Sequence, residues 1–164
     1  MKAALSLIDV LDGEIDDLED QIHRLVKEDP RARLLMSVPG IGFVLAHTIV
    51  GEIGDISRLS SPKKLCGYTA LCPRVYQSGG VDHRGSLAKN GPKYLRWVLI
   101  EAATHACRHP LYKDRYERTA RRLGRQRGRK VARVELARRL AEAIFHMLSA
   151  NEPFGPTIVA HNAA

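Results

Sequence analysis

A serine in a glycine-rich segment is the first group in this 164-residue sequence that could carry out covalent chemistry. Ser78 precedes two glycines, and the cations Arg84, Lys89 and Arg96 follow further along the chain. A serine hydroxyl can attack a phosphodiester while nearby cations stabilise the negative charge that develops on the phosphate. Serine and glycine are also frequent in ordinary flexible turns. From these residues alone, a nucleophile and a plain turn both stay open.

A glycine-containing turn is the second candidate. The segment Val-Pro-Gly-Ile-Gly at 38–42 lies between two short predicted helices. Gly40 and Gly42 would let the backbone approach a phosphate closely, with N–H groups at the start of the next helix pointing at it. This pattern is typical of the helix-hairpin-helix motif, which contacts the DNA backbone without reading its sequence. The alternative is a plain connection between helices.

Positive charge is concentrated in the later part of the chain. The sequence holds 26 Lys and Arg against 18 Asp and Glu, so its net charge is +8. Residues 1–29 hold 3 basic and 9 acidic residues, whereas residues 108–139 hold 13 basic and 3 acidic ones. A block this basic is typical of a nucleic-acid binder, and the alternative is a solvated basic helix. Its candidate phosphate contacts are Arg121, Arg122, Arg125, Arg127, Arg129 and Lys130.

The elements that must position these groups are predicted to be mainly α-helical. Apolar periodicity, with proline and glycine signals at the ends, bounds the predicted helices. Strands are expected at most in a short hairpin within residues 70–90. Four aromatic residues at helical spacings are expected in the core or at its rim: Tyr94, Trp97, Tyr112 and Tyr116. The helices predicted after residue 30 span residues 31–37, 43–53, 62–68, 93–108, 110–123 and 131–148.

Residues 1–29 are predicted to form one acidic amphipathic helix. Isoleucines such as Ile8 and Ile15 alternate with leucines such as Leu11 and Leu18 at spacings of three and four, which favours a two-stranded parallel coiled coil. A homodimer through residues 5–26 is therefore expected. Acidic residues beside this stripe would repel their copies, so packing against the basic remainder of the same chain is the alternative.

The remaining composition predicts a cytoplasmic protein without a metal of its own. No apolar run approaches the roughly 20 residues that span a bilayer, and the first residues do not resemble a signal peptide. The three cysteines form no C-x-x-C pair, which indicates a reducing compartment. Five aspartates share the N-terminal helix and are interpreted as a solvated face rather than metal ligands: Asp9, Asp12, Asp16, Asp17 and Asp20.

The order of these motifs resembles a known family. From about Leu34 to Leu148 the chain looks like the C-terminal (transposase 20) domain of insertion-sequence transposases of the IS-one-ten type. The residues that carry the resemblance are the turn at 38–42, Glu-Ile-Gly-Asp-Ile at 52–56, Ser61 with Leu65, Gly67, Pro73, Ser78 with Gly79, Gly85, Lys89 with Gly91, Leu95 with Arg96, and the basic helical tail.

The resemblance implies that Ser78 is the nucleophile that joins DNA covalently, in a recombination directed by a structured guide RNA. Arg84, Lys89 and Arg96 would be phosphate contacts, an assignment that rests on their charge and loop position more than on the family. Family members also carry an N-terminal RuvC-like domain with four acidic metal ligands, for which the residues before Leu34 leave no room. Mg²⁺ is therefore expected only with that missing domain, and this chain alone is not expected to perform strand transfer.

Three segments and one function are predicted. An acidic helix (1–29) precedes a helical DNA-binding domain (30–150) and a flexible tail (151–164). The predicted function is to bind double-stranded DNA, to contact a guide RNA, and to present Ser78 in DNA transposition. The alternatives are a non-catalytic helix-hairpin-helix nucleic-acid-binding module and a coiled-coil interaction protein.

Overall fold

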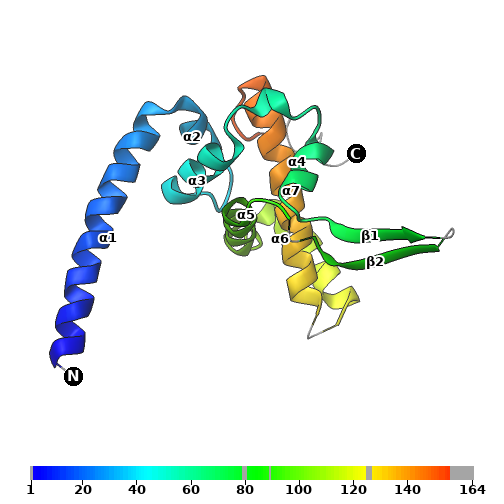
Figure 1. Cartoon of the computed structure of the whole chain (residues 1–164), viewed down its shortest axis with the longest axis horizontal. Coiled ribbons are helices and arrows are strands. Elements are labelled where there is room, and N and C mark those ends of the chain that lie inside the picture. The colour runs from blue at the N-terminus through cyan, green and yellow to red at the C-terminus, as the bar shows by residue number, and fades with distance from the viewer. Residues whose placement is uncertain (1, 79–80, 89, 125–126, 156–164) are drawn as a thin grey trace.

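The computed structural model describes residues 2–78, 81–88, 90–124 and 127–155 and is mainly helical, which confirms the predicted fold class. Figure 1 shows a helical body from which the first helix and a β-hairpin project in different directions. The elements in chain order are α1 (Lys2–Glu28), α2 (Pro30–Leu35), α3 (Phe43–Ile53), a 3₁₀ turn η1 (Ile56–Arg58), α4 (Pro62–Tyr68), β1 (Pro73–Ser78), β2 (Val81–Leu87), α5 (Lys93–Ala106), α6 (Pro110–Arg122) and α7 (Gly128–Ala150).

Three helices begin with the same device, a capping side chain followed by proline. The Asp29 carboxylate accepts a hydrogen bond from the Arg31 N–H at 2.8 Å, and Ser61 Oγ accepts one from the Lys64 N–H at 3.3 Å. His109 caps α6 in the same way. Proline fits the first helical position because the N–H that it lacks would have no partner within the helix there. These signals explain why α4 and α6 begin where the sequence predicts, and why α2 begins at Pro30, one residue before its predicted start.

The core is built around α7, which packs against α4, α5 and α6. Alanines on α7 and α5, among them Ala137 and Ala102, are fully buried and let the helices approach closely. Tyr112 lies in this core, whereas Tyr94 and Trp97 lie on α5 with 55% and 52% of their surface exposed. The two exposed rings therefore contribute little to the packing of the body.

Helix α1 contacts the body only near its C-terminal end. Val26 is buried, and the His23 ring packs edge-on against Phe43 of α3, with 5.4 Å between the ring centres. The preceding turns stand away from the body (Figure 1). Their apolar stripe, which includes Ile15 and Leu18, is more than half exposed. Helix α1 therefore does not fold back onto the basic part of its own chain.

Strands β1 and β2 form the antiparallel hairpin that the sequence allows within residues 70–90. Val75 lies opposite Arg84, and Ser78 lies opposite Val81 at the end of the ladder. Gly79 and Gly80 lie outside the described residues. The hairpin extends away from the helices as an arm (Figure 1).

The part of the predicted tail that the structure describes, residues 151–155, lies against the body. The Phe154 N–H donates a hydrogen bond to Ser37 Oγ at 2.9 Å, and the Phe154 ring lies near Tyr112. Among the described residues, no helix is long and apolar enough to cross a membrane.

Candidate nucleic-acid interface

Ser78 lies at the far end of the arm. Five residue steps separate it from Pro73 at the base of β1, which at about 3.3 Å per residue corresponds to roughly 16 Å. Arg84 lies further down the same arm, opposite Val75. Lys89 lies outside the described residues. The backbone thus places Ser78 at the outermost described position of the hairpin.

Arg96 lies in the first turn of α5, within the helical body. Its side chain is partly buried, and its Nη1 atom has no hydrogen-bond partner among the residues described. The length of the arm separates this helix from Ser78. The structure therefore does not bring together the serine and all three cations that the sequence grouped with it.

The two glycines of the 38–42 turn have different surroundings. Gly40 has a φ of +89°, and a β-carbon there would lie 2.6 Å from the Ala102 carbonyl oxygen and 2.8 Å from the Ala106 nitrogen. Glycine at this position therefore allows the turn to pack against α5. Gly42 is the exposed N-cap residue of α3, and a β-carbon there would meet no atom within 4 Å. Of the two glycines, Gly42 is the one that a phosphate could reach.

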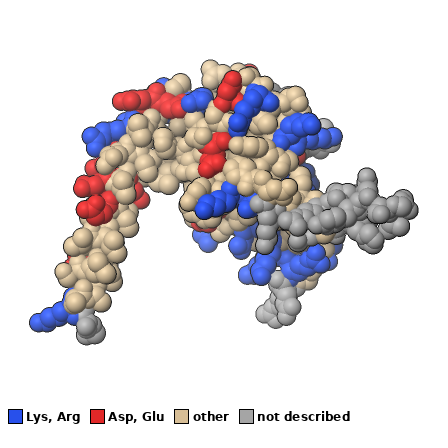
Figure 2. All heavy atoms as spheres, viewed as in Figure 1, with Lys and Arg blue, Asp and Glu red and all other residues tan. Residues whose placement is uncertain are grey.

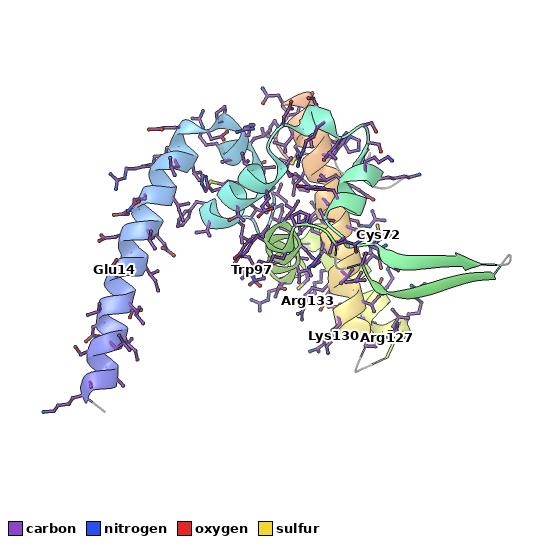
Figure 3. All side chains as sticks on the ribbon, in the orientation of Figure 1. Glu14, Cys72, Trp97, Arg127, Lys130 and Arg133 are labelled. Carbon is purple, nitrogen blue, oxygen red and sulfur yellow. The ribbon has the colours of Figure 1, made fainter. Side chains whose placement is uncertain are left out.

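The strongest concentration of charge lies where α6 turns into α7. Figure 3 shows Arg127 and Lys130 at this end of the molecule, with Arg133 further along α7. In Figure 2, blue and red spheres both occur along α1 and on the upper part of the body, whereas the charged spheres on the lower part are blue in this view. Arg125 of the predicted set lies outside the described residues. The other five are all exposed: Arg121, Arg122, Arg127, Arg129 and Lys130.

Most of the described cations of this set have no acidic partner within the described residues. Arg121 pairs with Glu117 on the same helix at 2.8 Å. In the part of the chain that the structure describes, Arg122, Arg129 and Lys130 form no ion pair. Their charges are therefore available to a negatively charged ligand.

Two basic grooves flank the contact between α6 and α7. The first groove has a volume of about 710 Å³ and lies between the end of α5, one side of α6 and the start of α7. The second groove has a volume of about 410 Å³ and is lined by Thr119 and by residues on the opposite side of α6. The cations of the first groove are Arg108, Lys113, Arg121, Arg129 and Arg133. Those of the second groove are Arg115, Arg118 and Arg122.

The positive charge of the second groove is partly neutralised by Glu135, a carboxylate that lines it. Arg115 Nε donates a hydrogen bond to Glu135 Oε1 at 3.0 Å, and Thr119 Oγ1 donates one to Glu135 Oε2 at 3.0 Å. Burial acts to raise the pKa of Glu135, but the hydrogen bonds from Thr119 and Arg115 outweigh it and hold this pKa below its ordinary value. Glu135 therefore stays ionised and compensates the charge of Arg115.

Sequence reasoning did not single out three cations of the first groove, Arg108, Lys113 and Arg133. Lys113 and Arg133 lie on helices α6 and α7, and Arg108 lies in the turn between α5 and α6, so none of the three stands in a run of positive charges. Lys113, Glu117 and Arg121 are spaced by four residues, which puts them on one face of α6. A helical-wheel reading of residues 110–122 would have found Lys113 on this face, but not Arg108 or Arg133, which lie on other segments.

No metal centre is formed by the described residues. No three carboxylate, histidine or cysteine side chains lie close enough together there to hold an ion. The aspartates of α1 are distributed along one helix, and they do not meet ligands from other elements. These donors do not fit a divalent-metal site, so no step proposed below runs through a metal bound by this chain.

Comparison with known proteins identifies the class as the transposases of insertion sequences. A family model described as "Transposase IS116/IS110/IS902 family" matches residues 32–118, which is more than half of the chain. The chain belongs to this family. The resemblance found in the sequence is thereby confirmed.

Individual relatives match over most of this chain. The "Transposase for insertion sequence element IS1111A" of Coxiella burnetii is 28% identical over 87% of this chain and 40% of its own length. The "Pilin gene-inverting protein" of Moraxella bovis is 32% identical over 88% of this chain and 46% of its own length. A Pseudomonas aeruginosa protein named "Probable family 20 transposase" is 30% identical over 91% of this chain and 44% of its own length. The chain spans less than half the length of these relatives.

Proposed function

We propose that this chain is the part of a transposase that binds double-stranded DNA and presents Ser78 to a DNA phosphate during recombination. The observation that carries the proposal is the unpaired positive charge on α6 and α7, in a chain that belongs to a transposase family. A relative named for inverting a pilin gene supports recombination as the type of reaction. The proposal concerns this chain, which spans less than half the length of its relatives.

The charge of α6 and α7 favours a polyanionic partner over plain solvation. Residues 108–139 carry a net charge of +10, and close like charges destabilise a folded protein unless a partner compensates them. DNA supplies a dense row of phosphates, and its binding releases condensed counterions. Gly42 at the start of α3 offers a further place where a phosphate could meet backbone N–H groups.

In the reaction proposed for Ser78, its Oγ attacks the phosphorus of a DNA phosphodiester. A bond from Oγ to phosphorus forms as the bond from phosphorus to the leaving sugar oxygen breaks. The hydroxyl proton leaves Ser78, and the released sugar oxygen takes up a proton. One phosphodiester replaces another, so the reverse reaction can rejoin the strands without an outside energy source. A position at the end of a projecting arm suits contact with a bound duplex.

Two partners complete the proposal. The basic surface would also hold the phosphates of a structured guide RNA, as the family resemblance implies. A second copy of this chain would pair with the exposed stripe of α1, in which Ile15 and Leu18 are each more than half exposed. Parallel pairing of such stripes is the usual arrangement of a two-stranded coiled coil.

The test of the proposed nucleophile is Ser78→Ala in an intact transposase of this family. The variant is expected to lose recombination and to bind DNA as tightly as the unchanged protein. Ser86→Ala, in β2 of the same arm, is the matched control and is expected to keep both properties. Recombination that survives Ser78→Ala would favour the rival reading, a non-catalytic nucleic-acid-binding module.

A second test uses this chain by itself. Incubation with DNA is expected to give no covalent adduct, because the chain spans less than half of its relatives. An adduct that forms with this chain and is lost in Ser78→Ala would overturn that expectation, while supporting Ser78 as the nucleophile.

A further inference from the structure

The first groove differs from a plain basic surface because its floor is apolar. Cys107, Tyr116 and Ala120 line it together with cations from α6 and α7. Tyr116 is only partly buried in the core, so part of its surface is left to the groove. A cationic rim over a floor that contains an aromatic ring suits a ligand with both phosphate and a flat apolar part.

Arg133 adds a cation of α7 to the first groove. It lines the first groove, and its Nε atom is buried without a hydrogen-bond partner among the residues described. Figure 3 shows it on α7, above Lys130 and Arg127. Buried donors are nearly always paired in folded proteins. Among the residues described, Arg138 Nε on the same helix is also buried without a partner, so the unpaired atom does not by itself mark a ligand, and Arg133 contributes to the groove through its charge.

A fully paired duplex would use only part of this groove. Its phosphates lie on the outside and could meet the cations at the rim, whereas its bases are stacked inside and could not reach Tyr116. An unpaired nucleotide presents a free base that can stack on an aromatic ring and phosphates that can meet arginines. A volume of about 710 Å³ lies within the range typical of ligand pockets.

We propose that the first groove binds an unpaired nucleotide of a DNA strand, with its base against Tyr116 and a base or phosphate oxygen accepting a hydrogen bond from Arg133. The proposal rests on the proposed function, because it takes DNA as the partner, and it names which state of the DNA this groove recognises. The second groove does not share the chemistry. Among the residues described, no aromatic side chain lines it. Each groove has one internally paired cation, Arg115 with Glu135 in the second and Arg121 with Glu117 in the first, so the aromatic ring is the difference between them.

The experiment compares two short duplexes that differ only in one unpaired 2-aminopurine. This chain is expected to bind the bulged duplex roughly tenfold more tightly than the matched one, and stacking on Tyr116 is expected to quench the fluorescence of the unpaired base. Tyr116→Leu is expected to lose the preference and the quenching while keeping affinity for the matched duplex, whose bases do not reach Tyr116. Arg133→Met is expected to lose the preference for the bulged duplex. The matched control is Arg118→Gln with Arg122→Gln in the second groove, which should keep the preference.

The outcomes separate this proposal from the proposed function. Equal affinity for the two duplexes would overturn the nucleotide site while leaving DNA binding in place. Failure to bind either duplex would overturn both. A bulged RNA bound more than tenfold more tightly than the bulged DNA, or a free nucleotide bound as tightly as the bulged strand, would overturn the assignment to a DNA strand.

Discussion

Gly128, the first residue of α7, lies directly against the backbone carbonyl of Ala120 in α6. A β-carbon at residue 128 would overlap this carbonyl oxygen, so the helices can approach this closely only with glycine here. The contact joins α6 to α7 at the end where the cations gather. It therefore helps to set the spacing of the two basic grooves.

Gly128→Ala is expected to separate the start of α7 from α6. Overpacking of this kind costs about 1–3 kcal/mol, so the variant should unfold at a lower urea concentration than the unchanged chain. Gly51→Ala is the control, because a β-carbon at this exposed position in α3 would meet nothing within 4 Å. That change should stabilise the chain by up to about 1 kcal/mol. Equal stability of Gly128→Ala and the unchanged chain would contradict the role given to the contact.

Gly42→Asp is expected to stabilise the fold slightly and, at the same time, to weaken the binding of a phosphate. An aspartate N-cap should stabilise α3 by a few tenths of a kcal/mol relative to glycine. The same carboxylate would repel a phosphate at this position, so affinity for duplex DNA should fall severalfold. Gly42→Asn places a similar cap there without the charge and should bind DNA more tightly than Gly42→Asp. Equal DNA affinity of the Asp and Asn variants would show that the turn does not meet a phosphate.

Acid is expected to weaken the contact between α6 and α7 through Glu135. Because the pKa of Glu135 in the folded chain is lowered from 4.5, its contribution to stability is present above the unfolded-state pKa. This contribution is lost as the pH falls through the lowered value. Glu135→Gln should therefore lose less stability than the unchanged chain between about pH 6 and pH 3, measured by urea unfolding. A steeper acid loss in Glu135→Gln would reverse the sign and contradict the hydrogen-bond arrangement.

The stripe of α1 is expected to act between chains rather than within one. Ile15→Asn with Leu18→Asn should convert a dimer to a monomer in analytical ultracentrifugation, with the helical body still folded, because both side chains are exposed. Val26→Ala is the contrasting change, since Val26 is buried where α1 joins the body. It should lower the thermal stability of the body. An unchanged chain that sediments as a monomer at high concentration would contradict the proposed dimer.

Local signals in the sequence predicted much of the fold. Helix α3 begins and ends where predicted, and the prolines at residues 62 and 110 place the starts of α4 and α6. Helix α7 begins at Gly128, three residues before the predicted start at Val131. The prediction began too late because residues 127–130 carry no apolar periodicity. That earlier start depends on the contact with Ala120, which lies in another helix.

The candidate site could be predicted only in part. The charge of α6 and α7 is visible in composition, and the end of a hairpin can be expected around Ser78. The first groove depends on the way α5, α6 and α7 pack, so neither its Tyr116 floor nor the unpaired Arg133 atom can be seen in a linear pattern. The packing of Gly40 on Ala102 and Ala106 is likewise a contact between distant segments.

The central claim, that α6 and α7 bind DNA phosphates, is tested most directly by a titration of duplex DNA at several salt concentrations. The logarithm of the binding constant is expected to fall linearly with the logarithm of the salt concentration, with a slope of about −0.9 for each phosphate contacted. Changing Arg121, Arg129 and Lys130 together to Gln should make the slope shallower by roughly two to three. The same change at three exposed lysines elsewhere, Lys27, Lys63 and Lys64, should leave the slope nearly unchanged. No binding near physiological salt, or a slope that the first triple variant does not alter, would contradict the claim.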